Sequence, residues 1–179
     1  MGKKWKICKS EIIIKSPWIT FRKDKCETPK KISVPEYYTW EKRDCVIVFP
    51  LKKNDNVILI EQYRHGVKKV CIDFPGGTIE KRKTVIQAAN EKLIAEVGYQ
   101  SDKIIEIAAY DMDSSYSNQR VHFVIAFDCQ KVLTQKSSLE EIETFLIPIK
   151  KLEKFIEEKM DCLLCSHLNY KALNYLNNI

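Results

Sequence analysis

Glycine and proline are scarce in this sequence, and it has no long apolar run. Five glycines and six prolines among 179 residues are too few for a collagen-like or low-complexity chain. No segment approaches the roughly 20 consecutive apolar residues that span a bilayer, so no membrane partner is expected. The basic start of the chain is not followed by an apolar stretch, and we expect no secretory signal. The 45% hydrophobic and 30% charged residues suit one globular domain, or one domain with a small extension.

Cysteine is more frequent, but its spacing is irregular. The seven cysteines are an odd number scattered over the whole chain, and a chain of this size with a sufficient core does not need disulfides. We therefore expect reduced thiols and a cytoplasmic protein. The one close pair is Cys162 and Cys165, but a zinc site needs four ligands, and the nearby His167 does not complete the set. The helical pattern around the pair favours two ordinary buried cysteines, with a metal site as the alternative.

The charge of the chain is mildly positive. A formal charge of +6 is consistent with an anionic ligand. The lysines are spread along the chain and do not form the concentrated stripe that binders of nucleic-acid polymers usually carry. The composition therefore indicates a solvated surface and no nucleic-acid polymer as partner.

The order of apolar patterns predicts a mixed α/β fold. Residues 1–44 alternate like strands and carry many aromatic side chains, so we expect an N-terminal antiparallel β extension followed by a main domain over residues 45–179. Residues 45–51 and 57–63 flank a polar turn and are expected to form a hairpin. In residues 84–97, Val85, Ala89, Leu93 and Val97 make one helical face, with Thr84 as N-cap and Gly98 as the stop. Strands over 104–109, 121–127 and 145–149 and helices over 151–159 and 163–176 complete a mixed sheet with helices packed on it.

One segment, Gly76 to Tyr99, resembles the Nudix box. The family pattern is a glycine, five residues, a glutamate, seven residues, Arg-Glu, an apolar residue, any residue, Glu-Glu, any residue, a glycine and an apolar residue. Counted from Gly77, the spacing in this chain is complete, and the apolar and glycine frame is present. The residues at these positions are Gly77, Lys83, Glu91, Lys92, Leu93, Ala95, Glu96, Gly98 and Tyr99.

The flanking segments resemble the ADP-ribose pyrophosphatase branch of the Nudix family, in the same order along nearly the entire chain. They are residues 16–19, 62–66, 74–77, 118–122 and 140–143. The resemblance implies a Nudix α/β/α sandwich with an N-terminal antiparallel sheet that in relatives pairs across a homodimer. It also implies hydrolysis of a nucleoside diphosphate linked to another moiety, such as ADP-ribose, with Mg²⁺ or Mn²⁺.

The departures from the box concern the metal. In relatives, glutamates on one helix face hold a divalent cation, a hard ion that takes oxygen ligands. The family pattern carries four glutamates and one arginine at positions 83, 91, 92, 95 and 96, a sum of −3, whereas this chain has Lys83, Glu91, Lys92, Ala95 and Glu96, a sum of zero. Weak or absent metal binding, and weak or lost activity, is the expectation.

Several carboxylates remain as candidates for the chemistry. Glu96 is the candidate catalytic and metal-binding residue on the helix, and Glu80 in the preceding loop is a second possible metal ligand. Glu140 and Glu141 lie where the resemblance implies a catalytic glutamate. Each has an alternative role as an ordinary surface charge.

Candidate ligand-binding residues come from the same segments. They are Arg64, Gly76, Gly77, Lys83, Lys92, Trp18 and Tyr38. A guanidinium binds phosphate through two hydrogen bonds, although Arg64 could instead form a salt bridge, perhaps with Glu96. The two lysines could contact a pyrophosphate where metal would stand, or be merely solvated, and the two aromatic residues could stack on a base or serve the core or a dimer interface. The alternative to a hydrolase is an inactive nucleotide-binding or regulatory module, and a third hypothesis is a protein that binds only a partner.

Overall fold

The computed structural model describes residues 3–132 and 141–179. The chain divides into two compact units, and the first contains residues up to 44 together with residues 110–120. The second contains residues 45–109 and 121–179. Each unit is described by itself.

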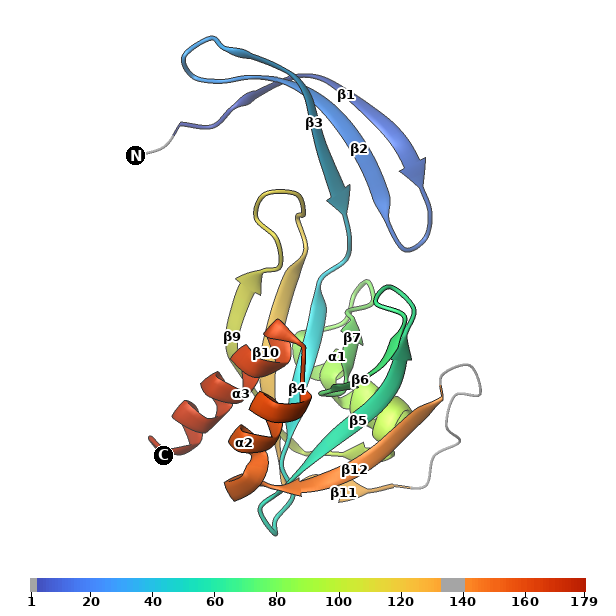
Figure 1. Ribbon diagram of the computed structural model, residues 1–179, viewed down its shortest axis with the longest axis vertical. Helices are drawn as coiled ribbons and strands as arrows, with labels where there is room; N and C mark the ends of the chain where they lie inside the picture. Colours follow the sequence, from blue (N-terminus) through green and yellow to red (C-terminus); the bar gives the residue numbers. More distant parts are fainter. Residues whose placement is uncertain (1–2, 133–140) are drawn as a thin grey trace. The chain divides into compact units, whose positions relative to one another are not determined.

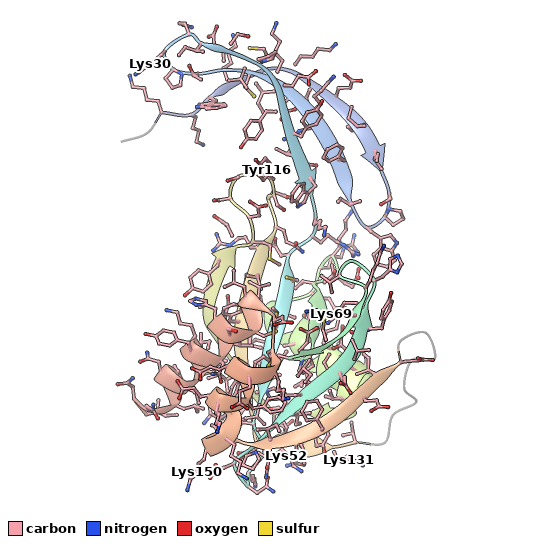
Figure 2. All side chains as sticks on the ribbon, viewed as in Figure 1. Lys30, Lys52, Lys69, Tyr116, Lys131 and Lys150 are labelled. Atoms are coloured by element: carbon pink, nitrogen blue, oxygen red, sulfur yellow. The ribbon has the colours of Figure 1, made fainter. Side chains whose placement is uncertain are left out.

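An antiparallel sheet forms the first unit, as the alternating pattern predicted. Its strands are β1 (Lys6–Lys15), β2 (Thr20–Glu27) and β3 (Ser33–Glu41), in the order β1-β2-β3. The chain turns after β1 because the Ser16 hydroxyl oxygen accepts the N–H groups of Trp18 (3.2 Å) and Ile19 (3.1 Å). Trp40 stacks on Tyr116, which Figure 2 labels, with ring centroids 5.7 Å apart. Aromatic contacts thus join β3 to the 110–120 segment.

Short sheets form the middle of the second unit. One has the order β7-β4-β10-β9, and its strands are β7 (Gly76–Thr78), β4 (Cys45–Pro50), β10 (Arg120–Phe127) and β9 (Lys103–Asp111). Another has the order β12-β5-β6, with β12 (Ile142–Pro148), β5 (Asn56–Arg64) and β6 (Lys69–Asp73). The strands β8 (Tyr99–Gln100) and β11 (Gln130–Lys131) pair with each other.

The predicted hairpin of residues 45–51 and 57–63 is wrong. β4 and β5 belong to different sheets and share a single bridge, between Leu51 and Val57. β4 pairs in parallel with β10, and its residues Val46, Val48 and Phe49 are fully buried. A continuous apolar run is typical of a strand covered on both faces. The polar turn was therefore read correctly, but the partner of β4 lies about 75 positions later and could not be deduced from the turn.

Helices cover both faces of these sheets. Figure 1 shows α2 (Ile149–Lys159) and α3 (Leu163–Leu176) in front and α1 (Val85–Lys92) behind, and both α1 and α3 contact β4. α1 begins as predicted at Thr84, whose hydroxyl accepts the Gln87 N–H (3.2 Å) while the Gln87 side chain accepts the Thr84 N–H (2.9 Å). These reciprocal bonds satisfy two N–H groups at the helix start.

The end of this helix differs from a regular α-helix. Residues Leu93–Val97 form a π-helical turn, η1, and Gly98 closes it with a left-handed φ of 70°. Gly98 is therefore the stop that the sequence predicted, at a backbone conformation that favours glycine. The predicted apolar face is also confirmed, because Ala89, Leu93 and Val97 are buried in the core. Along the residues that the structure describes, no helix is long and apolar enough to cross a bilayer.

Candidate functional site

The Gly-Gly strand and the helix meet at a buried carboxylate. β7 pairs with β4 so closely that a Cβ on Gly76 would lie 2.4 Å from the Val46 carbonyl oxygen. The Gly76 N–H donates to Oε2 of Glu96 at 3.0 Å, and Glu96 is only 9% exposed. The carboxylate of Glu96, the candidate catalytic group, thus connects the π-helical turn η1 to β7 by a hydrogen bond.

Lys92 lies beside the same strand. A Cβ on Gly77 would come within 2.8 Å of Cε and 3.0 Å of Nζ of Lys92, so the lysine chain runs directly over the Gly77 backbone. No carboxylate in the described ranges lies within ion-pair distance of Lys92. An ammonium group, which carries three hydrogen-bond donors, therefore lies against the Gly-Gly strand that also binds Glu96.

Lys83 has a different environment. Its ammonium forms an ion pair with the Glu91 carboxylate, and both side chains are substantially exposed. The Nudix pattern has glutamate at position 83 and arginine at position 91, so this chain carries the same pair with the charges exchanged. Lys83 is therefore an ion-pair partner of Glu91, and its role in binding a ligand stays a prediction.

The residues of the box do not fit a divalent metal. Ala95 offers no metal ligand and is exposed within the π-helical turn, whereas Glu96, the next residue, is buried. Glu80 is exposed in the loop before the helix. A hard cation needs several oxygen ligands, and among the described residues of the box helix Glu96 is the one buried carboxylate. In the described part of the chain, the acidic and thiol groups close enough to share an ion are Asp73, Cys162 and Cys165, which lie outside the box.

Arg64 is held by an acidic partner at the end of β6. Its Nε and Nη2 lie 2.8 and 2.6 Å from Oδ2 of Asp73, so the salt-bridge alternative is confirmed, with Asp73 as the partner instead of Glu96. The Asp73 side chain is 11% exposed and that of Arg64 is 44% exposed. The pair therefore fixes the guanidinium while leaving part of it open to solvent. Sequence reasoning missed Asp73, although an acid ending an apolar strand directly before Phe74-Pro75 was a usable signal.

The other predicted site residues are dispersed. Trp18 is 74% exposed and Tyr38 is 40% exposed, and both belong to the first unit. Tyr38 stacks on Phe21, with ring centroids 5.7 Å apart, and its hydroxyl donates to Glu36, which raises the pKa of Tyr38. Glu141 is exposed directly before β12, and Glu140 lies outside the described residues.

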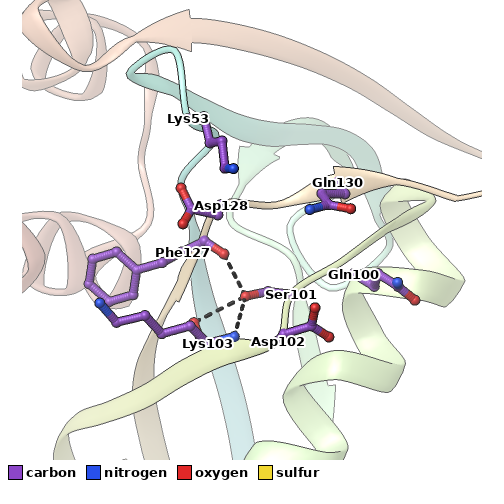
Figure 3. Close-up of a pocket in the computed structure, with 8 residues that line it drawn as sticks. All are labelled: Lys53, Gln100, Ser101, Asp102, Lys103, Phe127, Asp128 and Gln130. Carbon is purple, nitrogen blue, oxygen red and sulfur yellow. Dashed lines mark hydrogen bonds between the residues drawn. The ribbon is translucent and has the colours of Figure 1, made fainter.

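A small hollow elsewhere in the second unit does not fit a nucleotide. It measures about 140 Å³ and is lined by Lys53, residues 100–103, Phe127, Asp128 and Gln130 (Figure 3). Ligand pockets for molecules of drug size measure about 300–1,000 Å³. The Ser101 hydroxyl in this hollow already forms hydrogen bonds within the fold. It donates to the Phe127 carbonyl at 2.6 Å and accepts the Lys103 N–H at 3.1 Å. This hollow contains none of the predicted site residues.

Comparison with known proteins identifies the family of this chain. The NUDIX domain profile matches residues 41–164, and the chain belongs to this family. It is 24% identical over 117 residues to an ADP-ribose pyrophosphatase of Bacillus subtilis (strain 168), covering 64% of this chain and 63% of that protein. It is 25% identical over 116 residues to the ADP compounds hydrolase NudE of Escherichia coli (strain K12), covering 65% and 62%. The matched region thus spans less than two thirds of these relatives.

A solved structure confirms the fold over almost the whole chain. The crystal structure of an ADP compounds hydrolase superposes with a TM-score of 0.90, covering 99% of this chain and 97% of that one at 20% identity. The Nudix α/β/α sandwich with an N-terminal antiparallel sheet, expected from the resemblance, is therefore the fold of this protein.

Proposed function

We propose that this protein binds a nucleoside diphosphate derivative such as ADP-ribose, and hydrolyses it weakly or not at all. The named relatives act on ADP-ribose and ADP compounds, which supports this ligand class. In this proposal the Lys92 ammonium, with the exposed edge of Arg64, meets the phosphates where relatives would use a divalent cation. Lysine binds phosphate as a compact point charge, and arginine binds it through a planar fork.

The observation that carries the proposal is the place of Lys92 over Gly77. A cation that is already part of the chain lies where the box would gather carboxylates, and it repels a second cation. Two unit charges about 4 Å apart interact by roughly 4 kcal/mol at an effective dielectric near 20, and the interaction doubles for a divalent ion. Because Lys92 is half exposed, solvent reduces this figure, but its sign still opposes metal.

The second candidate function is a metal-dependent pyrophosphohydrolase. Family membership favours it, as does the retained Glu96. In that case, Glu96, Glu80, Glu140 and Glu141 would have to supply the oxygen ligands and the base, despite Lys92.

Calorimetry with ADP-ribose in the presence of EDTA separates the two functions. We expect binding without metal, at least tenfold weaker binding in Lys92→Ala, and unchanged binding in Lys81→Ala, which removes an exposed lysine from the loop before the helix. A parallel assay follows ADP-ribose cleavage with Mg²⁺ or Mn²⁺. Metal-dependent turnover together with no binding in EDTA would establish the hydrolase instead.

We also propose that the protein acts as a cytoplasmic homodimer through the first unit. All ten residues of β1 are exposed at the edge of its sheet, and Ile7, Ile12, Ile13 and Ile14 are each at least 45% exposed. An unpaired edge with apolar side chains is a template for pairing with another chain. Light scattering should give twice the mass of the chain, and Ile12→Lys with Ile14→Lys should give the monomer mass. A monomeric wild type at micromolar concentration would refute this proposal.

A further inference from the structure

Two cysteines occupy the first turn of α3. Cys162 is the N-cap residue, and its sulfur accepts the Cys165 N–H at 3.2 Å. An N-cap side chain ordinarily accepts this N–H through oxygen. Residues three apart on a helix lie close together, and the sulfur atoms of Cys162 and Cys165 lie within 4.8 Å of each other. The two thiols are therefore placed near each other by the helix itself.

The two thiols differ in access. Cys162 is half-buried, whereas Cys165 is 2% exposed. The Cys165 thiol donates to Oδ1 of Asp73 at 3.5 Å. A reagent from solution can thus reach Cys162 first, while Cys165 stays behind it next to an acceptor for its proton.

The start of α3 contacts the strand that ends at Asp73. Lys69, labelled in Figure 2, begins β6 and forms an ion pair with Asp161, the residue before Cys162. Asp73 ends β6 and contacts both Cys165 and Arg64. The geometry of the dithiol therefore rests on two contacts to one strand.

We propose that Cys162 and Cys165 form a reversible redox-active dithiol, which exchanges with a low-molecular-weight disulfide such as oxidised glutathione. Its chemistry uses neither Lys92 nor the box, and its link to the proposed nucleotide site is Asp73, which contacts Cys165 and also binds Arg64. It adds a covalent modification that the family membership does not supply.

The exchange proceeds in two balanced steps. The Cys162 thiolate attacks one sulfur of the small disulfide, so that a mixed disulfide forms and one thiolate leaves and takes up a proton. The Cys165 thiol then loses its proton through Asp73 to the second departing thiolate, and its sulfur attacks the Cys162 sulfur. Two protein thiols are oxidised to one disulfide, and the small disulfide is reduced to two thiols.

The electrostatics support Cys162 as the attacking group. The neighbouring Cys165 side chain lowers the pKa of Cys162, and the Cys165 backbone N–H acts in the same direction. The proximity of Cys162 and burial raise the pKa of Cys165. The start of a helix also favours a thiolate. The first thiol is thereby activated while the second stays protonated until the mixed disulfide forms.

A metal fits the same cluster less well. Asp73, Cys162 and Cys165 make three ligands, whereas a structural zinc takes four. The guanidinium of Arg64 already binds Oδ2 of Asp73, and its positive charge opposes a cation there. A dithiol needs no fourth group.

A titration in glutathione buffers tests the proposal on the full chain. After acid quenching, alkylation and peptide mapping, we expect Cys162 and Cys165 to lose alkylation together. At fixed oxidised glutathione, the ratio of oxidised to reduced protein should vary inversely with the square of the reduced glutathione concentration. Cys165→Ser should instead carry one glutathione on Cys162, with an inverse first-power dependence. In Cys162→Ser, residue 165 should stay unmodified.

The matched control is Cys71→Ser. Cys71 is a half-buried cysteine on β6 whose Sγ lies 3.9 Å from the Lys69 carbonyl, so its removal should leave the transition unchanged. Persistence of both free thiols in the most oxidising buffer would overturn the proposal, as would equal glutathionylation of Cys165 in Cys162→Ser. One equivalent of copurified zinc that protects both thiols until a chelator is added would also overturn it, in favour of a metal site.

Discussion

Replacing Lys92 by glutamate should create a divalent-metal site beside Glu96. The substitution changes the local charge by −2 on the face where Glu96 already lies. Even at the dielectric of water, a divalent ion and a unit charge about 4 Å apart interact by roughly 2 kcal/mol, so the change is about 4 kcal/mol. Ordering the new side chain costs up to about 2 kcal/mol. The remaining roughly 2–4 kcal/mol corresponds to a gain in affinity of about 30-fold to 1,000-fold.

Manganese binding, measured by calorimetry or by the electron paramagnetic resonance signal of free Mn²⁺, gives this gain directly. Lys81→Glu is the matched control, because it changes the charge equally at an exposed position of the preceding loop. Ala95→Glu should gain far less than Lys92→Glu, since Ala95 faces solvent. Equal affinities in Lys92→Glu and Lys81→Glu would refute the placement of position 92 beside Glu96.

Three further predictions concern single contacts. Gly76→Ala should destabilise the fold by about 1–3 kcal/mol, because the new Cβ would meet the Val46 backbone. Gly77→Ala should destabilise it by under about 1 kcal/mol, because the new Cβ meets only the flexible end of Lys92. Thermal unfolding of the two variants checks this difference. Glu96→Ala should lower the free energy of unfolding by about 1–3 kcal/mol, because the Gly76 N–H loses its acceptor. Glu96→Gln should lower it less, since an amide oxygen still accepts, and a denaturant titration of both variants measures the difference. The iodoacetamide reactivity of Cys162 should rise with a midpoint pH below that of an ordinary thiol, and removal of the Cys165 thiol should move it up.

The boundaries of the box helix could be predicted because they depend on neighbouring residues. Thr84 caps α1 through Gln87, three positions away, and Gly98 ends the helix through its own left-handed backbone. Both signals act within one turn. The apolar face of the helix was likewise visible in the spacing, and the core of the second unit confirms it for Leu93 and Val97.

The pairings across the sheets could not be predicted in the same way. A parallel partner such as β10 for β4 follows from contacts between distant segments, and the polar turn after β4 carries no information about it. Arg64 was recognised as a candidate, but its partner Asp73 lies opposite Ile60 in the register of β5 and β6. The ion pair therefore depends on the long arginine side chain and not on a direct cross-strand neighbour. The π-helical turn was also hidden, because its residues suit an α-helix equally well.

The residue types along the box follow the structural role of each position. Glu96 binds the Gly76 N–H in a buried place, and its loss would leave a buried donor without a partner, whatever becomes of metal. Position 83 lies on an exposed surface, where the lysine forms an ion pair with Glu91. Position 92 borders a glycine, whose missing side chain leaves room for a long cation. The fold thus requires a hydrogen-bond acceptor at position 96, and it accommodates lysines at positions 83 and 92.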